Sequence, residues 1–139
     1  MTEAALLPEV GTVLPEREFP IGRADLVRYA GASGDFNPIH WNDRAARAAG
    51  LSGVIAHGML TMGLAARVLA EWAGGADAVE QYRVRFRRPV EVPDDGVVTV
   101  SVRGVVTARQ PDGRVTVELT VHGGGKKVLS AASAVLRPR

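Results

Sequence analysis

Along the chain, apolar residues recur at helical spacing in the first half and at every second position in the second half. Residues 11–21 alternate around a proline, which predicts an edge strand or an extended lead-in. Over residues 25–30, apolar side chains three and four positions apart predict a short amphipathic helix that stops at Gly31 and Gly34. The segment that follows has the composition of a loop.

Two more helices are predicted before the pattern changes its period. Residues 44–49 form a short one, which Asn42 or Asp43 can cap and which Gly50 ends. The longest apolar pattern, over residues 58–72, leaves few positions for a polar face. We therefore expect a central helix that is buried or wrapped by other elements.

The second half is predicted to form long antiparallel strands. Four valine-rich segments alternate apolar and polar residues, at 79–92, 97–108, 114–122 and 126–136. Turns that contain glycine, at 94–96, 111–113 and 123–125, predict that the strands follow one another as a meander. One buried helix with such a sheet predicts an α+β fold, with the antiparallel sheet wrapped around the long central helix.

The composition fits a single domain over residues 1–139. Hydrophobic residues make up 46% of the chain and charged residues 23%, which are ordinary values for a folded protein. The chain has no cysteine, which excludes disulfides, thiolate metal sites and a cysteine nucleophile. Its net charge of +2 gives no reason to expect a nucleic acid as partner.

The sequence shows no targeting or membrane-spanning pattern. Its first residues lack the basic region and the long apolar stretch of a signal peptide. No apolar run reaches the ~18 residues that a membrane span needs. We therefore expect a cytoplasmic domain without a membrane span.

Three polar side chains are gathered just after the first predicted helix, where Gly34 and Pro38 interrupt regular structure. Asp35, Asn37 and His40 bring a carboxylate, an amide and an imidazole together within six residues. A turn of this kind can direct polar side chains into a pocket, where a carboxylate and an imidazole act as acid and base. The alternative is that Asp35 and Asn37 only build the turn, and that His40 is a buried structural histidine.

A second candidate feature lies at the start of the predicted central helix, at His57 and Gly58. The first N–H groups of a helix have no intrahelical acceptor and lie at the positive end of its dipole. The N–H of Gly58 is therefore a candidate donor to an oxyanion. For His57 we expect a supporting role, either as a cap of the helix or as a brace for the loop.

Together, these two motifs resemble the MaoC-like hydratase/dehydratase family of hot-dog folds. Residues 29–40 are similar to its catalytic Asp-x-Asn-x-x-His segment, and residues 55–61 to its His-Gly-Met-Leu helix start. The resemblance covers nearly the whole chain, which at this length looks most like the B subunit of the mycobacterial-type (3R)-hydroxyacyl-ACP dehydratase. It implies a hot-dog fold, a dimer whose sheets join edge to edge, and a reaction without cofactor or metal.

The reaction that the resemblance implies is the reversible removal of water from a (3R)-hydroxyacyl thioester, on ACP or CoA, in fatty-acid metabolism. The same hydro-lyase acts in reverse as an (R)-specific enoyl hydratase. Asp35 and His40 would act as an acid/base pair at carbons C2 and C3 of the thioester, and either one could take the C2 proton. Asn37 would hydrogen-bond within the site, and Gly58 would donate its N–H to the thioester oxygen with His57 in support.

Basic residues supply candidates for docking the carrier. Arg83 and Arg85 lie on a predicted strand, and Lys126 and Lys127 follow a triple glycine. They could contact the phosphates of CoA, or the phosphopantetheine and acidic surface of an acyl carrier. The alternative is an ordinary solvated strand face. No metal-ligand spacing such as His-x-x-x-His occurs, so we expect no metal.

Two other functions are compatible with the same resemblance. A hot-dog thioesterase would release free acid and thiol, and a non-catalytic acyl-binding subunit would complete the pocket of a partner dehydratase. The intact Asp-x-Asn-x-x-His favours the catalytic role, because the partner in two-component dehydratases typically lacks it. We expect a homodimer, or a heterodimer with another hot-dog subunit, since a curled sheet leaves an open edge strand.

Overall fold

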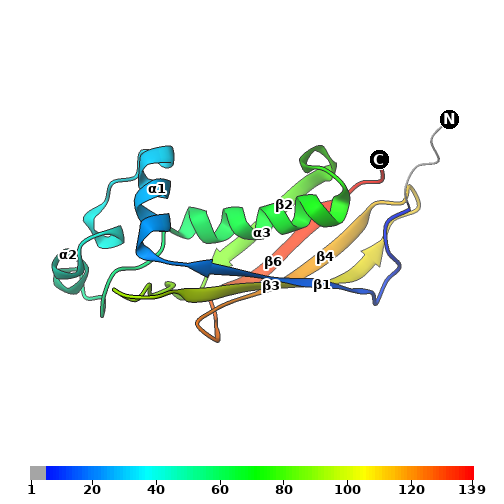
Figure 1. Cartoon of the computed structure of the whole chain (residues 1–139). Coiled ribbons are helices and arrows are strands. Elements are labelled where there is room, and N and C mark those ends of the chain that lie inside the picture. The colour runs from blue at the N-terminus through cyan, green and yellow to red at the C-terminus, as the bar shows by residue number, and fades with distance from the viewer. Residues whose placement is uncertain (1–5) are drawn as a thin grey trace.

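The computed structural model describes residues 6–139, and the start of the N-terminal segment, residues 1–5, lies outside this range. Its strands are β1 (Val13–Ile21), β2 (Val79–Phe86), β3 (Val98–Arg109), β4 (Val115–Gly123), β5 (Lys126–Lys127) and β6 (Leu129–Leu136) (Figure 1). Its helices are α1 (Arg23–Ser33), α2 (Asp43–Ala48) and α3 (Gly58–Ala73), with two short 3-10 helices, η1 (Pro38–His40) and η2 (Ala76–Ala78).

The strands form one antiparallel sheet in the order β1-β3-β4-β6-β2, with β5 paired to β4. The predicted meander is wrong at one point, because β2 pairs with β6 and not with β3, which follows it in sequence. The segment between β2 and β3 contains Pro89 and Pro93, which have no N–H for a strand ladder. That segment is a crossover and not a hairpin, so β1 and β2 become the two edge strands.

Helix α3 lies along one face of the sheet (Figure 1), which is the predicted α+β arrangement. Its side chains Ala65, Val68 and Leu69 are fully buried. Gly104 of β3 lets the helix come close, because a Cβ there would lie 2.7 Å from the ring of Trp72. In the single chain, α3 is buried on one side only, since Met59 on the same helix is 59% exposed.

Some of the predicted boundaries are wrong. Helix α1 continues through Gly31 and ends only at Gly34, whose left-handed φ of 78° suits a residue without a Cβ. The strand predicted from residue 79 ends at Phe86, six residues early. The last predicted strand is divided at Val128 into β5 and β6.

The other two predicted helices agree with the structure to within one residue. Asn42 caps α2, since its side-chain oxygen accepts a hydrogen bond from the Ala45 N–H at 3.0 Å. Helix α3 begins at Gly58 and ends at Ala73, and Gly74 after it is the C-cap, in the left-handed conformation.

Helices α1 and α2 lie at the end of the sheet where α3 begins, and the C-terminus lies toward the other end (Figure 1). The chain between β1 and α3 therefore brings the turn with Asp35 and His40 next to the first residues of the central helix. Within residues 6–139, every helix is too short or too polar to cross a membrane.

Candidate active site

The turn between α1 and α2 is held by its own hydrogen bonds. Asp35 Oδ1 accepts from the Asn37 N–H at 3.1 Å, and Asn37 Oδ1 accepts from the Ile39 N–H at 3.2 Å. The second bond caps η1, the single helical turn that carries His40. The turn-building interpretation is therefore correct for Asn37 and for one oxygen of Asp35. It does not compete with the acid/base interpretation, because the other oxygen of Asp35 faces His40.

His40 is buried, and one of its ring nitrogens has a fixed role. Nδ1 lies 2.8 Å from the main-chain oxygen of Ile55. A carbonyl can only accept, so Nδ1 carries the hydrogen and Nε2 of the neutral ring holds the lone pair. Nε2 lies 3.8 Å from Asp35 Oδ2, and the Asp35 side chain is 52% exposed. The two groups face each other beyond direct hydrogen-bond distance, so neither is occupied by a hydrogen bond to the other.

His57 packs directly on this pair. Its ring is stacked on the ring of His40, with centroids 3.8 Å apart and planes inclined by 20°. The ring of Tyr29 also meets the His57 ring edge-on, with centroids 4.7 Å apart. Its Nε2 lies 3.1 Å from the main-chain oxygen of Asp35, while Nδ1 is buried without a hydrogen-bond partner among residues 6–139. His57 occupies the N-cap position of α3 but makes no side-chain cap hydrogen bond, so the structure fits the brace and not the cap.

Asp35, His40 and His57 form the one group among residues 6–139 whose potential metal-ligating atoms come together, within 4.8 Å of one another. A metal ion needs lone pairs that converge on one point. Stacked imidazole rings direct their lone pairs in nearly parallel planes, and each of these rings already uses one nitrogen as a donor. The arrangement therefore suits proton transfer better than metal binding, and the expected absence of a metal stays a prediction.

The start of α3 borders a cavity of about 300 Å³. The N–H groups of Leu60 and Thr61 donate to the His57 carbonyl at 3.0 and 3.3 Å. The N–H groups of Gly58 and Met59 are therefore the ones at this helix end without an intrahelical acceptor. The cavity wall is mostly apolar and includes Gly58 and Ile55, whose carbonyl binds His40. A carbonyl group placed beside Gly58 could extend an apolar tail into this cavity.

The structure separates the four predicted carrier-binding residues into two pairs. Lys126 and Lys127 form the exposed strand β5, and the Lys127 carbonyl accepts a hydrogen bond from Arg88 at 3.3 Å. Lys126 and Arg88 also line a common cavity of about 310 Å³. Arg83 and Arg85 are exposed on the edge strand β2. Of the two pairs, the lysines are therefore the one that borders a cavity, through Lys126.

Residues outside the predicted site also line or support it. Arg87 and Arg88 line the cavity beside Gly58, and both belong to the run of arginines from residue 83, which is one basic cluster in the sequence. Ile55 contributes a main-chain oxygen, for which a sequence carries no signal. Tyr29 lies in a recognised segment, but its contact with His57 depends on the fold.

Comparisons with known proteins agree on one family. The family profile described as "MaoC like domain" matches residues 8–123. The (R)-specific enoyl-CoA hydratase of Rhodospirillum rubrum is 33% identical over 119 residues, which are 85% of this chain and 81% of that protein. The 3-hydroxyacyl-thioester dehydratase X of Mycobacterium tuberculosis is 44% identical over 79 residues, which are 57% of this chain and 27% of that protein.

Solved structures give the same picture at the level of the fold. A MaoC-like dehydratase matches with a TM-score of 0.92 and 37% identity over 96% of this chain, which spans only 43% of that longer one. The (R)-hydratase from A. caviae involved in PHA biosynthesis matches with a TM-score of 0.81 and 26% identity, covering 94% and 96% of the two chains. A chain of the ChsH1-ChsH2 complex from Mycobacterium tuberculosis matches with a TM-score of 0.80 and 26% identity, covering 96% and 100%. The hot-dog fold is confirmed.

Proposed function

The chain belongs to the MaoC-like domain family, and from that premise we propose that it is a (3R)-hydroxyacyl-thioester dehydratase that also hydrates trans-2-enoyl thioesters (R)-specifically. Its relatives are named hydratases and dehydratases. The observation that carries the proposal is the position of His40 Nε2, 3.8 Å from Asp35 Oδ2 and beside the first turn of α3. The proposed substrate is an acyl-ACP or acyl-CoA of fatty-acid metabolism. The proposed enzyme is a hydro-lyase that acts in the cytoplasm.

In the proposed reaction, the C2–H and C3–O bonds break, a C2=C3 double bond forms, and water leaves. His40 and Asp35 divide two tasks, the removal of the C2 proton and the protonation of the departing hydroxyl. His40 exchanges protons only through Nε2, because Nδ1 is held by the Ile55 carbonyl. A well-placed acid or base of this kind contributes roughly 10²–10⁴-fold to the rate.

The thioester oxygen gains negative charge as the C2 proton leaves, and we assign the Gly58 N–H as its donor. Such a donor contributes roughly 10²–10³-fold. The acyl chain then extends into the apolar cavity beside Gly58. Asn37 supports the site by capping η1, and His57 supports it by bracing both His40 and the Asp35 backbone.

For the carrier, we propose that Lys126 and Lys127, with Arg88, contact its phosphates. Arg83 and Arg85 are assigned to the acidic surface of an acyl carrier protein. We further propose that the chain works as one domain over residues 1–139, paired with a second copy or a different hot-dog subunit. The name of the ChsH1-ChsH2 complex supports pairing of unlike subunits in a related fold.

The test is hydration of trans-2-enoyl-CoA, with chiral analysis of the product and with a partner subunit added where one is known. We expect the wild type to form the (R)-alcohol, and Asp35→Asn and His40→Ala each to lose about 10²-fold or more in kcat. Asp112→Asn, in the turn between β3 and β4, is a matched control away from the pair.

The proposal is wrong if the wild type hydrates the substrate and either variant of the pair keeps full activity. If free thiol and free acid appear from acyl-CoA and no alcohol forms, the hot-dog thioesterase is the better assignment. If activity appears only with a partner and survives both substitutions here, the chain is a non-catalytic acyl-binding subunit.

A further inference from the structure

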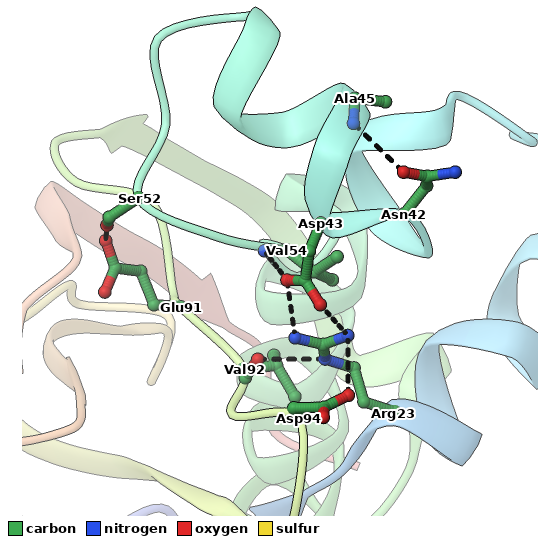
Figure 2. A network of polar contacts seen from close by, with 9 residues as sticks. All are labelled: Arg23, Asn42, Asp43, Ala45, Ser52, Val54, Glu91, Val92 and Asp94. Carbon is green, nitrogen blue, oxygen red and sulfur yellow. Dashed lines mark hydrogen bonds and ion pairs between the residues drawn. The ribbon is translucent and has the colours of Figure 1, made fainter.

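A polar network outside the acid/base pair joins three separate segments of the chain (Figure 2). Arg23, the first residue of α1, forms a two-pronged ion pair with Asp43, the first residue of α2, at 2.9 and 3.2 Å. Arg23 Nε also donates to the Val92 carbonyl at 3.0 Å, and Nη1 lies 3.7 Å from Asp94 Oδ1. One guanidinium therefore ties both helices to the crossover between β2 and β3.

Asp43 also holds the backbone that leads into the site. Its Oδ1 accepts a hydrogen bond from the Val54 N–H at 3.1 Å (Figure 2), and the Val54 carbonyl accepts from the Val92 N–H at 3.0 Å. The next residue, Ile55, donates its N–H to the Ile39 carbonyl at 3.2 Å. The Ile55 carbonyl is the acceptor of the His40 Nδ1–H. The group that decides the tautomer of His40 is therefore anchored, one residue upstream, by Asp43.

The anchor is built from strong contacts. Bidentate arginine–carboxylate pairs combine charge with fixed geometry, which lysine cannot reproduce. The two side chains are partly withdrawn from solvent, at 22% exposed for Arg23 and 29% for Asp43. Hydrogen bonds from Arg23 and then from the Val54 N–H lower the pKa of the Asp43 carboxyl below its usual value. The carboxylate therefore stays ionised through the neutral range.

We propose that Arg23 and Asp43 are positioning residues for the reaction, holding the Ile55 carbonyl where it keeps hydrogen on His40 Nδ1 and the lone pair on Nε2. The inference rests on the proposed function and deepens it. Neither residue touches the acid/base pair, so both act through the Val54–Ile55 backbone. When that carbonyl shifts, part of the population takes the other tautomer, whose Nε2 carries a hydrogen and cannot accept a proton. A misplacement of about 1 Å can cost ~10²-fold in rate.

The test combines steady-state kinetics with ¹⁵N NMR of the histidine rings, which reports the tautomer without any substrate. The chain has only three histidines, so His40 can be assigned by substitution. We expect the wild type to show His40 as the Nδ1–H form. Asp43→Ala and Arg23→Lys are expected to show a mixture of tautomers, with kcat lower by roughly 10- to 100-fold and KM changed less. Asp43→Asn keeps an oxygen for the Val54 N–H and is expected to lie between them and the wild type.

The matched control is Arg114→Ala. Arg114 makes a more exposed ion-pair cluster with Glu80 and Asp112 on another part of the sheet, and its loss is expected to change neither the tautomer nor kcat. The inference is overturned if folded Asp43→Ala keeps the wild-type tautomer with kcat within about twofold, or if Arg114→Ala shows the same losses.

A variant that does not fold, and a wild type that lacks the proposed activity, can each be distinguished from a failure of the Arg23–Asp43 anchor. If Asp43→Ala does not fold, Arg23→Lys and Asp43→Asn decide the question by the same two measurements. If the tautomer changes in the variants but the wild type hydrates no enoyl thioester, the anchor stands and the proposed function fails. If the wild type is active and the tautomer never changes, the proposed function stands and the anchor fails.

Discussion

At the scale of single residues, each histidine ring of the site has one nitrogen fixed as a donor to a main-chain carbonyl. His40 gives Nδ1–H to Ile55, and His57 gives Nε2–H to Asp35. The bond of His40 leaves a lone pair beside a carboxylate, where it can accept a proton. The bond of His57 leaves a buried nitrogen without a partner in the described chain, which costs stability. The residue that carries this cost, His57, is also the one whose hydrogen bond holds the Asp35 turn beside His40.

Two substitutions of His57 separate its hydrogen bond from its stacking. His57→Phe keeps a ring against His40 but loses the bond to the Asp35 carbonyl, while His57→Gln can keep a donor without the ring. We expect His57→Phe to be about as stable as the wild type, because losing a bond worth ~1 kcal/mol is offset by removing an unpaired nitrogen that costs ~1–3 kcal/mol. Its kcat should fall about tenfold, because the Asp35 turn is no longer held.

Thermal unfolding and steady-state kinetics on both variants check this expectation. His57→Gln should lose stability, since the ring that contacts both Tyr29 and His40 is replaced by a smaller, flexible side chain. Full activity of His57→Phe would show that the bond to Asp35 has no part in holding the site.

The proximity of Asp35 and His40 could be predicted from the sequence, and the contacts that surround them could not. Asp35, Asn37 and His40 are close in sequence, and the turn that joins them follows from glycine, proline and asparagine chemistry. The Ile55 carbonyl is a main-chain atom, which is the same in every residue. Arg23 and Asp43 are twenty positions apart, so their pairing depends on how two helix ends meet.

At the scale of elements, most helix ends and two of the three predicted strand pairings agree with the structure, while the pairing of β2 with β3 was wrong. Gly34, Asn42 and Gly74 mark helix ends through backbone conformation or capping, which are local properties. The turn at residues 94–96 is equally local, but it cannot specify which strand its neighbour pairs with. In the structure, β2 pairs with β6 across the sheet, which places β2 beside α3 and lets Phe86 pack on Gly58.

Tyr82 reports on the contact between β2 and α3. Its hydroxyl donates to the Met62 carbonyl at 2.9 Å, and burial raises the pKa of Tyr82 to about 12. The folded state thus keeps this proton at pH values where the unfolded chain has lost it. The corresponding stability is fully present below the unfolded pKa of about 10 and is lost as the pH rises toward 12.

We therefore expect the free energy of unfolding of the wild type to fall more steeply between pH 10 and pH 12 than that of Tyr82→Phe. Below pH 10, Tyr82→Phe should be less stable by about 1 kcal/mol, through loss of the bond to Met62. Denaturant unfolding across this range, with tyrosinate absorbance of the native protein, measures both effects. Parallel pH curves for the two proteins would contradict the burial of this hydroxyl.

At the scale of the whole molecule, the single chain leaves two features uncovered next to its site. One is the edge strand β2, which contains no proline, whereas the other edge strand, β1, contains Pro15 and Pro20. Prolines protect an edge from pairing, so β2 is the edge open to another chain. The second is a set of exposed apolar side chains, which consists of Phe36, Trp41, Met59 and Phe86. Apolar side chains exposed beside a site suggest a surface that a partner covers.

Pairing through β2 predicts a dimer that a substitution in this strand disrupts. Val84 lies in β2 where the register with β6 shifts, and a proline there removes an N–H and disfavours pairing of this edge with another chain. We expect the wild type at micromolar concentration to have twice the 14.7 kDa mass of one chain by light scattering. Val84→Pro should be monomeric and less active, because β2 ends at Phe86, which packs on Gly58 and lines the cavity.

Glu16→Pro is the control on the other edge, since Glu16 lies in β1 where the register with β3 shifts. It introduces the same residue into the edge that already carries prolines, so it should remain dimeric and active. Monomeric Glu16→Pro would mean that pairing uses β1 or depends on general stability. A wild type that is fully active as a strict monomer would instead show that one chain completes the site alone, and that the apolar side chains around it are covered by substrate and not by a partner.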